Sequence, residues 1–440
     1  MSSTRHAPKG SAIAYEKYMS SPEYAETRGI PGTAVAAKAQ LCTEARKRDL
    51  LFFVQALSLK DGGLRKVARD LLGALPKRGD GGNHEEELAH VLVEFCINPK
   101  CVVRFSDDKT SSSPELADVL RDFQERYEAK AKSDFVLTTI AKEIFETLDH
   151  ALDIGKMVVI EGESGIGKTS AVEAWCAAHQ GQVRFVSLSG ITHKTGFFRK
   201  LATAIGLAAA KAKATDMQLR VEEFFHKTRL MLVTDEAHYL WPQYHRSDSS
   251  PELVDWVNTA LVNHQVPVAL ICTDQFAKLK AGVEKRTGWT SEQFEHRVKR
   301  YKKLPSAPTK GDLEAVARKM LATQWNSDEQ QWSAAGPKPD PDFVKMVVGY
   351  ALTCKMRLPA VVDTITDARH QAREHGRFSV SATNLRTALL NYRIPSDEAW
   401  QLAFETPTSC STSPSDARNP QSGIGADLQS RCNRIATTLD

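Results

Sequence analysis

The chain has 440 residues, 42% of them hydrophobic and 25% charged, which is long enough for two or three folded units. Its 58 Lys and Arg residues against 54 Asp and Glu residues give a net charge of +4, which neither requires nor excludes a nucleic-acid partner. The apolar stretches are too short to span a bilayer, the N-terminus lacks the apolar core of a signal peptide, and the cysteines form no CxxC pair. We therefore expect a cytoplasmic protein with reduced thiols, without a membrane segment or a cysteine-based metal site.

The first part of the chain reads as helical and carries no motif that points to chemistry. Residues 1–12 are small, polar and basic, and we expect them to be disordered. Residues 13–132 read as a mostly helical region in which the apolar segments 50–54 and 88–95 can supply a core. The sequence leaves the role of this region open.

Residues 133–305 follow the pattern of an α/β domain. An apolar stripe with a spacing of four residues predicts a helix from Val136 to Leu152. Short apolar runs then alternate with helical stretches, as they do in parallel sheets that helices cover on both faces. The predicted strands are residues 157–160, 183–186, 230–233 and 268–272, with a last strand at 301–304. The predicted fold class is therefore α/β, a parallel sheet flanked by helices.

Strand signals stop after Leu304, and residues 306–400 read as a small helical domain. The predicted helices are residues 312–321, 341–352, 358–375 and 381–390. Residues 401–440 are rich in Ser, Thr, Pro and Gly and contain few large apolar residues, so we expect a disordered tail.

A complete phosphate-binding motif follows the first predicted strand. It matches G-x-x-x-x-G-K-[ST] and consists of Gly162, Glu163, Ser164, Gly165, Ile166, Gly167, Lys168 and Thr169, with Ser170 behind it. Glycines allow the tight turn in which successive N–H groups face phosphate oxygens, and the following helix adds its positive N-terminal end. We expect Lys168 to reach the β- and γ-phosphates of ATP and the Thr169 hydroxyl to bind Mg²⁺. The motif thus predicts a P-loop NTPase.

Two acidic residues end the third predicted strand. In a P-loop ATPase, Asp235 would hold the Mg²⁺ shell, and Glu236 would orient and activate the attacking water. Glu236 therefore distinguishes an ATP hydrolase from a passive nucleotide binder. His238 completes the string Asp-Glu-Ala-His, which also occurs in a helicase class, but the later glutamine/glycine/arginine motif of that class is missing from this sequence. We interpret His238 as a local hydrogen-bonding residue at a helix start.

The fourth predicted strand ends at Thr273. A polar side chain at this point would lie beside the acidic strand end and is a candidate sensor of the γ-phosphate. The alternative, in which Thr273 caps the next helix, has nearly equal support from the sequence.

The order of these parts resembles that of the AAA+ P-loop ATPases, with their Walker A and Walker B motifs and a helical lid. Within them the chain resembles the DNA-transposition ATPases of the MuB and TnsC type and the related ExeA-type ATPases. The strings Thr139–Lys142 and Thr195–Leu201 support this narrower similarity, which covers residues 135–390. The resemblance implies an AAA+ domain at 133–305, a helical lid at 306–400, ATP and Mg²⁺ as ligands, and a homo-oligomer.

The resemblance also implies roles for arginines. Arg297 is the best candidate for an arginine finger that reaches a neighbouring subunit's γ-phosphate, with Arg300 as the runner-up and a solvated basic face as the alternative. Arg357 is similar in position to the lid arginine that senses nucleotide, although the glycine that often precedes that arginine is replaced by Met356.

Lys and Arg residues surround Tyr301 between positions 297 and 303, and such a run can neutralise DNA phosphates or simply be solvated. The leading hypothesis is an AAA+ ATPase that oligomerises with ATP, binds double-stranded DNA and regulates a transposase or a similar partner. Two alternatives stay open. One is a signalling or defence ATPase that does not bind DNA, and the other is an ExeA-like motor, which normally has a membrane or cell-wall-binding segment.

Overall fold

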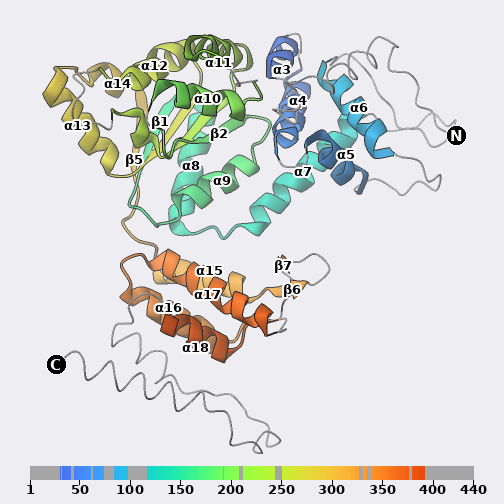
Figure 1. Ribbon diagram of the computed structural model, residues 1–440, viewed down its shortest axis with the longest axis vertical. Helices are drawn as coiled ribbons and strands as arrows, with labels where there is room; N and C mark the ends of the chain where they lie inside the picture. The colour runs from blue at the N-terminus through green and yellow to red at the C-terminus, as the bar shows by residue number, and fades with distance from the viewer. Residues whose placement is uncertain are drawn as a thin grey trace, which may run out of the picture.

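The structure is a computed structural model. It describes residues 30, 32–40, 44–60, 63–73, 84–97, 116–191, 193–207, 212–242, 250–326, 331–333, 336, 338–375 and 379–391. The segments 1–12 and 401–440, for which we predicted disorder, lie outside the described residues. Figure 1 shows the α/β sheet with the N-terminal helices beside it and a separate group of C-terminal helices below it.

A parallel sheet with the strand order β2-β3-β4-β1-β5 forms the centre of the α/β domain. Its strands are β1 (Met157–Glu161), β2 (Val183–Ser187), β3 (Met231–Asp235), β4 (Val268–Cys272) and β5 (Val298–Lys303). Strands β1, β3 and β4 are buried along their whole length, which explains their continuous apolar runs. The predicted α/β fold class is confirmed.

The last strand begins earlier than the sequence predicted, at Val298 and not at Tyr301. β5 lies at the edge of the sheet and pairs only with β1 among the described strands. Edge strands tolerate charged side chains on both faces, so β5 lacks the apolar run that identified the inner strands. The charged sequence Val-Lys-Arg-Tyr-Lys-Lys therefore gave no signal for the first half of this strand.

One face of the sheet is covered by α8 (Thr139–Ile154) and α9 (Lys168–Ala177), which pack on Val158 and Ile160 of β1. The Thr138 side chain accepts a hydrogen bond from the Ala141 N–H at 3.2 Å and caps α8. The helix ends at Gly155, whose φ of +62° suits a glycine. Because α9 begins directly after the phosphate loop, the packing of α9 on the sheet fixes where that loop lies.

The opposite face is covered by helices that pack on the alternate side chains of the strands, such as Val159 and Leu270. They are α10 (Lys194–Ala204), α11 (Ala214–Thr228), α12 (Glu252–Trp256), α13 (Gln275–Thr287) and α14 (Glu292–Arg297), with the short turns η1 (Ala237–Leu240), η2 (Val257–Leu261) and η3 (Val262–His264). Trp256 packs edge-on against Phe197 and Phe198, with ring centroids 5.4 and 5.0 Å apart. This layer packs on β3 and β4 through buried side chains such as Leu232 and Leu270.

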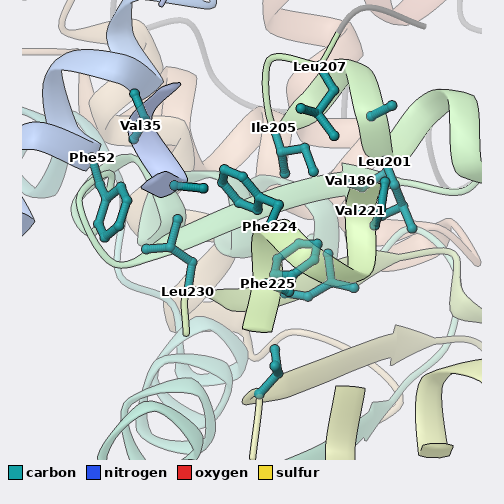
Figure 2. Close-up of a cluster of buried hydrophobic side chains, with 14 of the residues drawn as sticks. Val35, Phe52, Val186, Leu201, Ile205, Leu207, Val221, Phe224, Phe225 and Leu230 are labelled. Carbon is teal, nitrogen blue, oxygen red and sulfur yellow. The ribbon is translucent and has the colours of Figure 1, made fainter. Parts of the chain in front are cut away.

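The N-terminal region is helical where it is described and shares its core with this second face. Its helices are α3 (Gly32–Ala39), α4 (Ala45–Ser58), α5 (Gly63–Gly73), α6 (His84–Ile97) and α7 (Leu116–Asp134). Figure 2 shows Val35 and Phe52 next to Ile205 and Phe224 in one continuous cluster. The N-terminal helices are thus packed on the α/β domain through buried apolar side chains.

Polar contacts in the same interface join the N-terminal helices to strand β2. The Arg184 guanidinium is 3% exposed and donates to the Phe52 carbonyl at 3.2 Å and to the Gln55 side chain. The Gln55 amide in turn donates to the Ile205 carbonyl at 3.0 Å. Both terminal nitrogens of the guanidinium are paired, whereas its Nε has no partner among the described residues, so the contacts of the terminal nitrogens position α4 on β2.

The C-terminal helices are α15 (Lys310–Leu321), α16 (Pro341–Thr353), α17 (Arg357–Glu374) and α18 (Ala382–Asn391), close to the predicted ranges. The prediction that strands end at Leu304 is wrong, because β6 (Gln324–Asn326) and β7 (Gln331–Ser333) form an antiparallel pair between α15 and α16. Trp325 and Trp332 face each other across this pair. Strands of three residues are too short to show a periodic pattern. Among the described helices, none has the length and apolar character needed to cross a bilayer.

Candidate functional site

The phosphate loop joins the end of β1 to the start of α9. The Gly162 N–H donates to the Cys272 carbonyl at 3.2 Å, which ties the loop to the end of β4. Gly165 and Gly167 have φ values of +78° and +93°, a region that only glycine adopts readily. Ile166 is buried, whereas Glu163, Ser164 and Ser170 are exposed. The loop is therefore anchored at its base and open along its rim.

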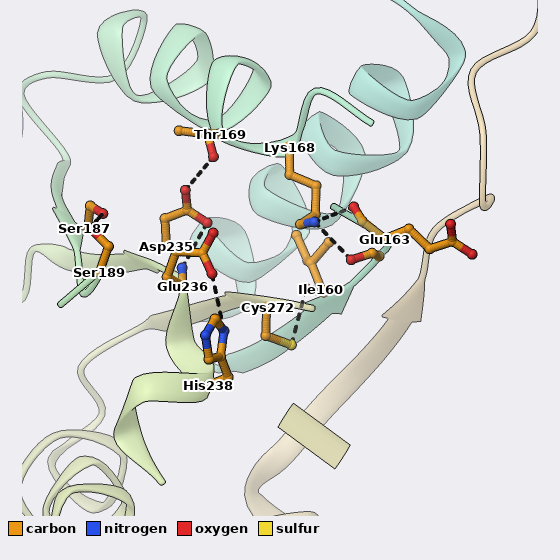
Figure 3. Close-up of polar contacts among 11 residues, drawn as sticks. Ile160, Glu163, Lys168, Thr169, Ser187, Ser189, Asp235, Glu236, His238 and Cys272 are labelled. Atoms are coloured by element: carbon orange, nitrogen blue, oxygen red, sulfur yellow. Dashed lines mark hydrogen bonds and ion pairs between the residues drawn. The ribbon is translucent and has the colours of Figure 1, made fainter. Parts of the chain in front are cut away.

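The Lys168 ammonium lies inside this loop. It donates to the Gly162 carbonyl at 2.8 Å and to the Glu163 carbonyl at 2.6 Å, as Figure 3 shows. Burial lowers the pKa of Lys168, while the charges of Asp235 and Glu236 act in the opposite direction. A partly desolvated cation surrounded by backbone amides is a strong site for phosphate oxygens.

Thr169 and Asp235 meet across the site, from the start of α9 and the end of β3. The Thr169 hydroxyl donates to Oδ2 of Asp235 at 2.6 Å, and Oδ1 of Asp235 accepts from the Glu236 N–H at 2.8 Å. Asp235 is only 2% exposed. A hydroxyl and a carboxylate are oxygen ligands of the kind that Mg²⁺ accepts together with water and phosphate, so these side chains fit that ion.

Glu236 has an unusual backbone for a residue that is not glycine, with φ 55° and ψ 39°. Its carboxylate lies 3.1 Å from Nδ1 of His238, the second residue of the short turn η1. Burial lowers the pKa of His238, against the opposing effect of Glu236. The turn directs Glu236 toward the space between Lys168 and Asp235 (Figure 3).

The Thr273 hydroxyl lies at the end of β4 and is buried without a hydrogen-bond partner among the described residues. The residue at the N-cap of α13 is Asp274, and no side-chain capping bond is made there. The helix-cap interpretation of Thr273 is therefore wrong. Its hydroxyl is free to bind a polar group that approaches the ends of β3 and β4.

Arg297 ends α14 and lies just before β5. Its Nε donates to Oδ1 of Asn263 at 2.9 Å and its Nη1 donates to the Gln293 carbonyl at 2.6 Å. Val298 pairs with Met157, the first residue of β1, so Arg297 lies at the end of the sheet away from the phosphate loop. A strand of five residues spans about 16 Å, which is too far for Arg297 to reach the loop of its own chain.

The basic residues around Tyr301 do not form one surface. Side chains alternate across β5, so Lys299, Tyr301 and Lys303 lie on the more exposed face and Arg300 and Lys302 on the other. Lys302 forms an ion pair of 2.9 Å with Glu143 of α8, and the Tyr301 hydroxyl donates to Glu161. The strand therefore divides the basic run between its two faces, and DNA binding by these residues stays a prediction.

The first turn of α17 lies directly on the phosphate loop. A Cβ atom on Gly165 would come within 2.6 Å of Met356, and one on Gly167 within 2.8 Å of Leu358. Arg357 lies between these residues, is half-buried, and is the first residue of α17. The structure thus brings the first turn of the lid helix to the loop, whereas the role of Arg357 in sensing nucleotide stays a prediction.

Sequence reasoning did not name the partners in two further contacts, although it interpreted His238 as a local hydrogen-bonding residue. One is the contact of His238 with Glu236. These residues are two positions apart, so their side chains can meet only if the backbone between them forms a tight turn, which the sequence did not indicate. The other joins α8 to the lid, where Asp312 accepts from the Thr139 N–H at 2.7 Å while closing a capping box with Thr309. The Thr-x-x-Asp spacing in the sequence indicates the capping box, but it gives no sign of the contact with Thr139.

A five-stranded parallel sheet with a glycine-rich loop after β1, a lysine and a threonine at the start of α9, and an acidic pair at the end of β3 defines the class of P-loop NTPases. Consistently, residues 153–279 match the family model of the AAA domain. The chain thus contains an AAA domain and resembles the AAA+ P-loop ATPases, among them proteins of the MuB type. This class of protein binds and hydrolyses nucleoside triphosphates.

Comparison with curated proteins finds the Mu-like prophage FluMu DNA transposition protein B of Haemophilus influenzae, which is 23% identical over 106 residues. The match spans 24% of this chain and 37% of the relative, so well under two thirds of that protein is covered.

Comparison with solved structures finds the ORC2 protein of Aeropyrum pernix in its ADPNP-ADP complexes. It has 15% identity and a TM-score of 0.42, and the match covers 58% of this chain and 68% of that one. Another is the Holliday junction branch migration motor RuvB of Thermotoga maritima, with 12% identity, a TM-score of 0.36, and coverage of 59% and 71%.

Proposed function

We propose that the chain binds ATP with Mg²⁺ in the loop Gly162–Thr169 and hydrolyses it with Glu236. The observation that carries this proposal is the convergence of the Lys168 ammonium, the Thr169–Asp235 contact and the Glu236 carboxylate on one cradle. A passive binder needs the loop but has no need for a carboxylate in a strained backbone next to it.

The chain's own groups have separable tasks in this reaction. The loop amides and Lys168 hold the β- and γ-phosphates, and the Glu236 carboxylate takes the proton of the attacking water. When bound, Mg²⁺ would neutralise phosphate charge, and Thr169 and Asp235 would hold the ion. The unpartnered Thr273 hydroxyl supports a contact with the γ-phosphate, and Arg357 on the lid supports closure over the nucleotide.

We also propose that the protein works as a homo-oligomer in which Arg297 completes the site of a neighbouring subunit. This arginine lies at the far end of the sheet from its own phosphate loop, and its guanidinium is half-exposed. A second copy is therefore the partner whose γ-phosphate it can reach. A guanidinium at that point stabilises charge on the transferring phosphoryl group.

The cellular role proposed is regulation of a transposase or a similar partner on double-stranded DNA. It is supported by the resemblance to a protein named for DNA transposition, which covers only part of each chain. A signalling or defence switch would use the same ATP site without DNA, and an ExeA-like motor would use it to drive a cell-envelope machine. No described residue favours either alternative.

Two measurements test this proposal. ATP hydrolysis by the purified protein should fall by about 10²-fold or more in Glu236→Gln, while ATP binding is kept. Duplex DNA should bind more tightly with Mg-ATP than without nucleotide in the Glu236→Gln protein, with an affinity that falls steeply between about 50 and about 200 mM salt. An inactive wild-type protein would refute the ATPase assignment. Salt-independent or absent DNA binding would refute the DNA role and favour the signalling switch.

A further inference from the structure

His238 is the buried partner of the proposed catalytic carboxylate. Its Nδ1 lies 3.1 Å from Oε2 of Glu236, and the side chains are 7% and 34% exposed, respectively. The carboxylate is thus open to the site on one side and supported by a nearly buried imidazole on the other, as Figure 3 shows.

The backbone between these residues explains how they meet. Glu236 is in the left-handed region, and the Tyr239 N–H donates to the Glu236 carbonyl at 3.0 Å, which closes the first turn of η1. The Trp241 N–H donates to the His238 carbonyl at 3.2 Å, which continues the turn. The left-handed conformation of a residue other than glycine costs roughly 1 kcal/mol or more. In return, it brings two side chains separated by one residue to the same side of the chain.

The imidazole has little freedom to move away. Its ring lies against the Tyr239 ring with a centroid separation of 4.5 Å, and the residue is 6% exposed. Burial also lowers its pKa, against the charges of Glu236 and Asp235. Because an ionised carboxylate can only accept, the ring must carry a proton on Nδ1 to interact favourably with Glu236.

We propose that His238 is a positioning residue that holds Oε2 of Glu236 so that Oε1 faces the attacking water. This inference rests on the proposed ATPase function and adds a specific requirement, a proton donor at the position of Nδ1. In a general base, an oriented carboxylate raises the rate without changing how ATP is held. His238 does not touch the nucleotide in this proposal, so its loss acts on kcat and leaves ATP affinity unchanged.

The test compares three replacements of His238 in the full chain. Asparagine places its amide N–H near the position of Nδ1, glutamine places it near Nε2, and alanine provides no donor. We expect kcat to fall about tenfold in His238→Ala and His238→Gln, the effect of one lost polar contact with the carboxylate. We expect His238→Asn to stay within about threefold of the wild type, and KM to stay unchanged in all three. Thermal unfolding of each variant separates a loss of folded protein from a loss of rate.

A cycle with Glu236→Gln completes the test. If His238 acts through Glu236, adding His238→Ala to Glu236→Gln should lower the residual rate by less than twofold, far less than it does alone. The inference is overturned if His238→Ala keeps the wild-type kcat, or if the asparagine and glutamine variants are equally active. Those results leave the ATPase assignment intact, whereas a wild-type protein that binds ATP without hydrolysing it overturns both.

Discussion

The Thr169 hydroxyl donates a hydrogen bond of 2.6 Å to Oδ2 of Asp235, although the two residues are far apart in the sequence. Thr169 lies in the first turn of α9, which follows β1 and the phosphate loop, and Asp235 lies at the carboxyl end of β3. Strands β1 and β3 are neighbours neither in the sheet nor in the chain. β4 lies between β1 and β3, so the packing of α9 across the sheet brings the pair together. The contact therefore depends on the whole α/β domain being folded.

Replacing Thr169 separates binding of the metal from binding of the phosphates. Thr169→Ala should weaken binding of Mg-ATP by about tenfold, because one oxygen ligand is lost, whereas binding of ATP in EDTA should stay unchanged. Thr169→Ser keeps the hydroxyl and serves as the control. Calorimetric titration with and without Mg²⁺ measures both quantities. Equal losses in the two conditions would show that Thr169 stabilises the loop and does not bind the metal.

Mixing two inactive variants tests the shared site. Arg297→Ala should lower ATP hydrolysis by about 10²-fold or more, and so should Glu236→Gln. A mixture of the two should regain activity, since a subunit with an intact Glu236 can meet a neighbour with an intact Arg297. Arg300→Ala, which changes another half-exposed arginine nearby, should keep most of its activity. A mixture that stays inactive, or an Arg297→Ala protein with full activity at all concentrations, would argue against an arginine finger at this position.

The docking of the N-terminal helices predicts a pH effect at Asp49 of α4. Burial raises the pKa of Asp49, although hydrogen bonds from Gln124 and Gln182 act in the opposite direction. The folded protein then binds this proton more tightly than the unfolded chain, so the cost of the buried charge is present at neutral pH and disappears as the pH falls through the raised pKa. Asp49→Asn should therefore raise the melting temperature relative to the wild type at about pH 7.5, and this difference should shrink at about pH 5. A difference that is independent of pH would show that the charge of Asp49 is not what costs stability.

Gln55 offers a second test of the same interface. It accepts from the buried Arg184 and donates to the Ile205 carbonyl, so Gln55→Ala leaves a buried guanidinium with fewer acceptors. We expect a loss of about 2 kcal/mol in the free energy of unfolding. Lys66→Ala, an exposed change on α5, should cost less than about 0.5 kcal/mol and provides the control. Denaturant titration measures both. Equal effects would show that the Gln55 contacts do not stabilise the docked arrangement.

The inner strands of the sheet could be predicted because burial on both faces demands continuous apolar runs, as in Val158–Ile160. The first half of the edge strand β5 and the pair of β6 with β7 could not, because charged edge residues and strands of three residues leave no period to detect. The docking of α4 on β2 was equally hidden. It depends on Arg184, whose charge in a strand sequence gives no sign that it is buried against the Phe52 carbonyl.

The candidate site also has parts that the sequence predicted and parts that it did not. The loop and the acids of β3 were predictable because phosphate and Mg²⁺ demand particular residue types at fixed spacing, and the structure brings Lys168, Thr169 and Asp235 together. The contact of Met356 with Gly165 joins parts of the chain that only the folded lid brings together. The choice between a sensor and a cap at Thr273 needed the hydrogen-bond partners of its hydroxyl, which a sequence does not give.

Titration of the protein with Mg-ATP in a calorimeter tests the central claim that the loop Gly162–Thr169 binds a nucleoside triphosphate. The wild-type protein should give saturable heat, and Lys168→Ala should bind at least about tenfold more weakly because the ammonium inside the loop is gone. Lys156→Ala, an exposed lysine just before β1, should bind as the wild type does. Absence of heat with the wild type, or equal affinity in Lys168→Ala, would contradict the account.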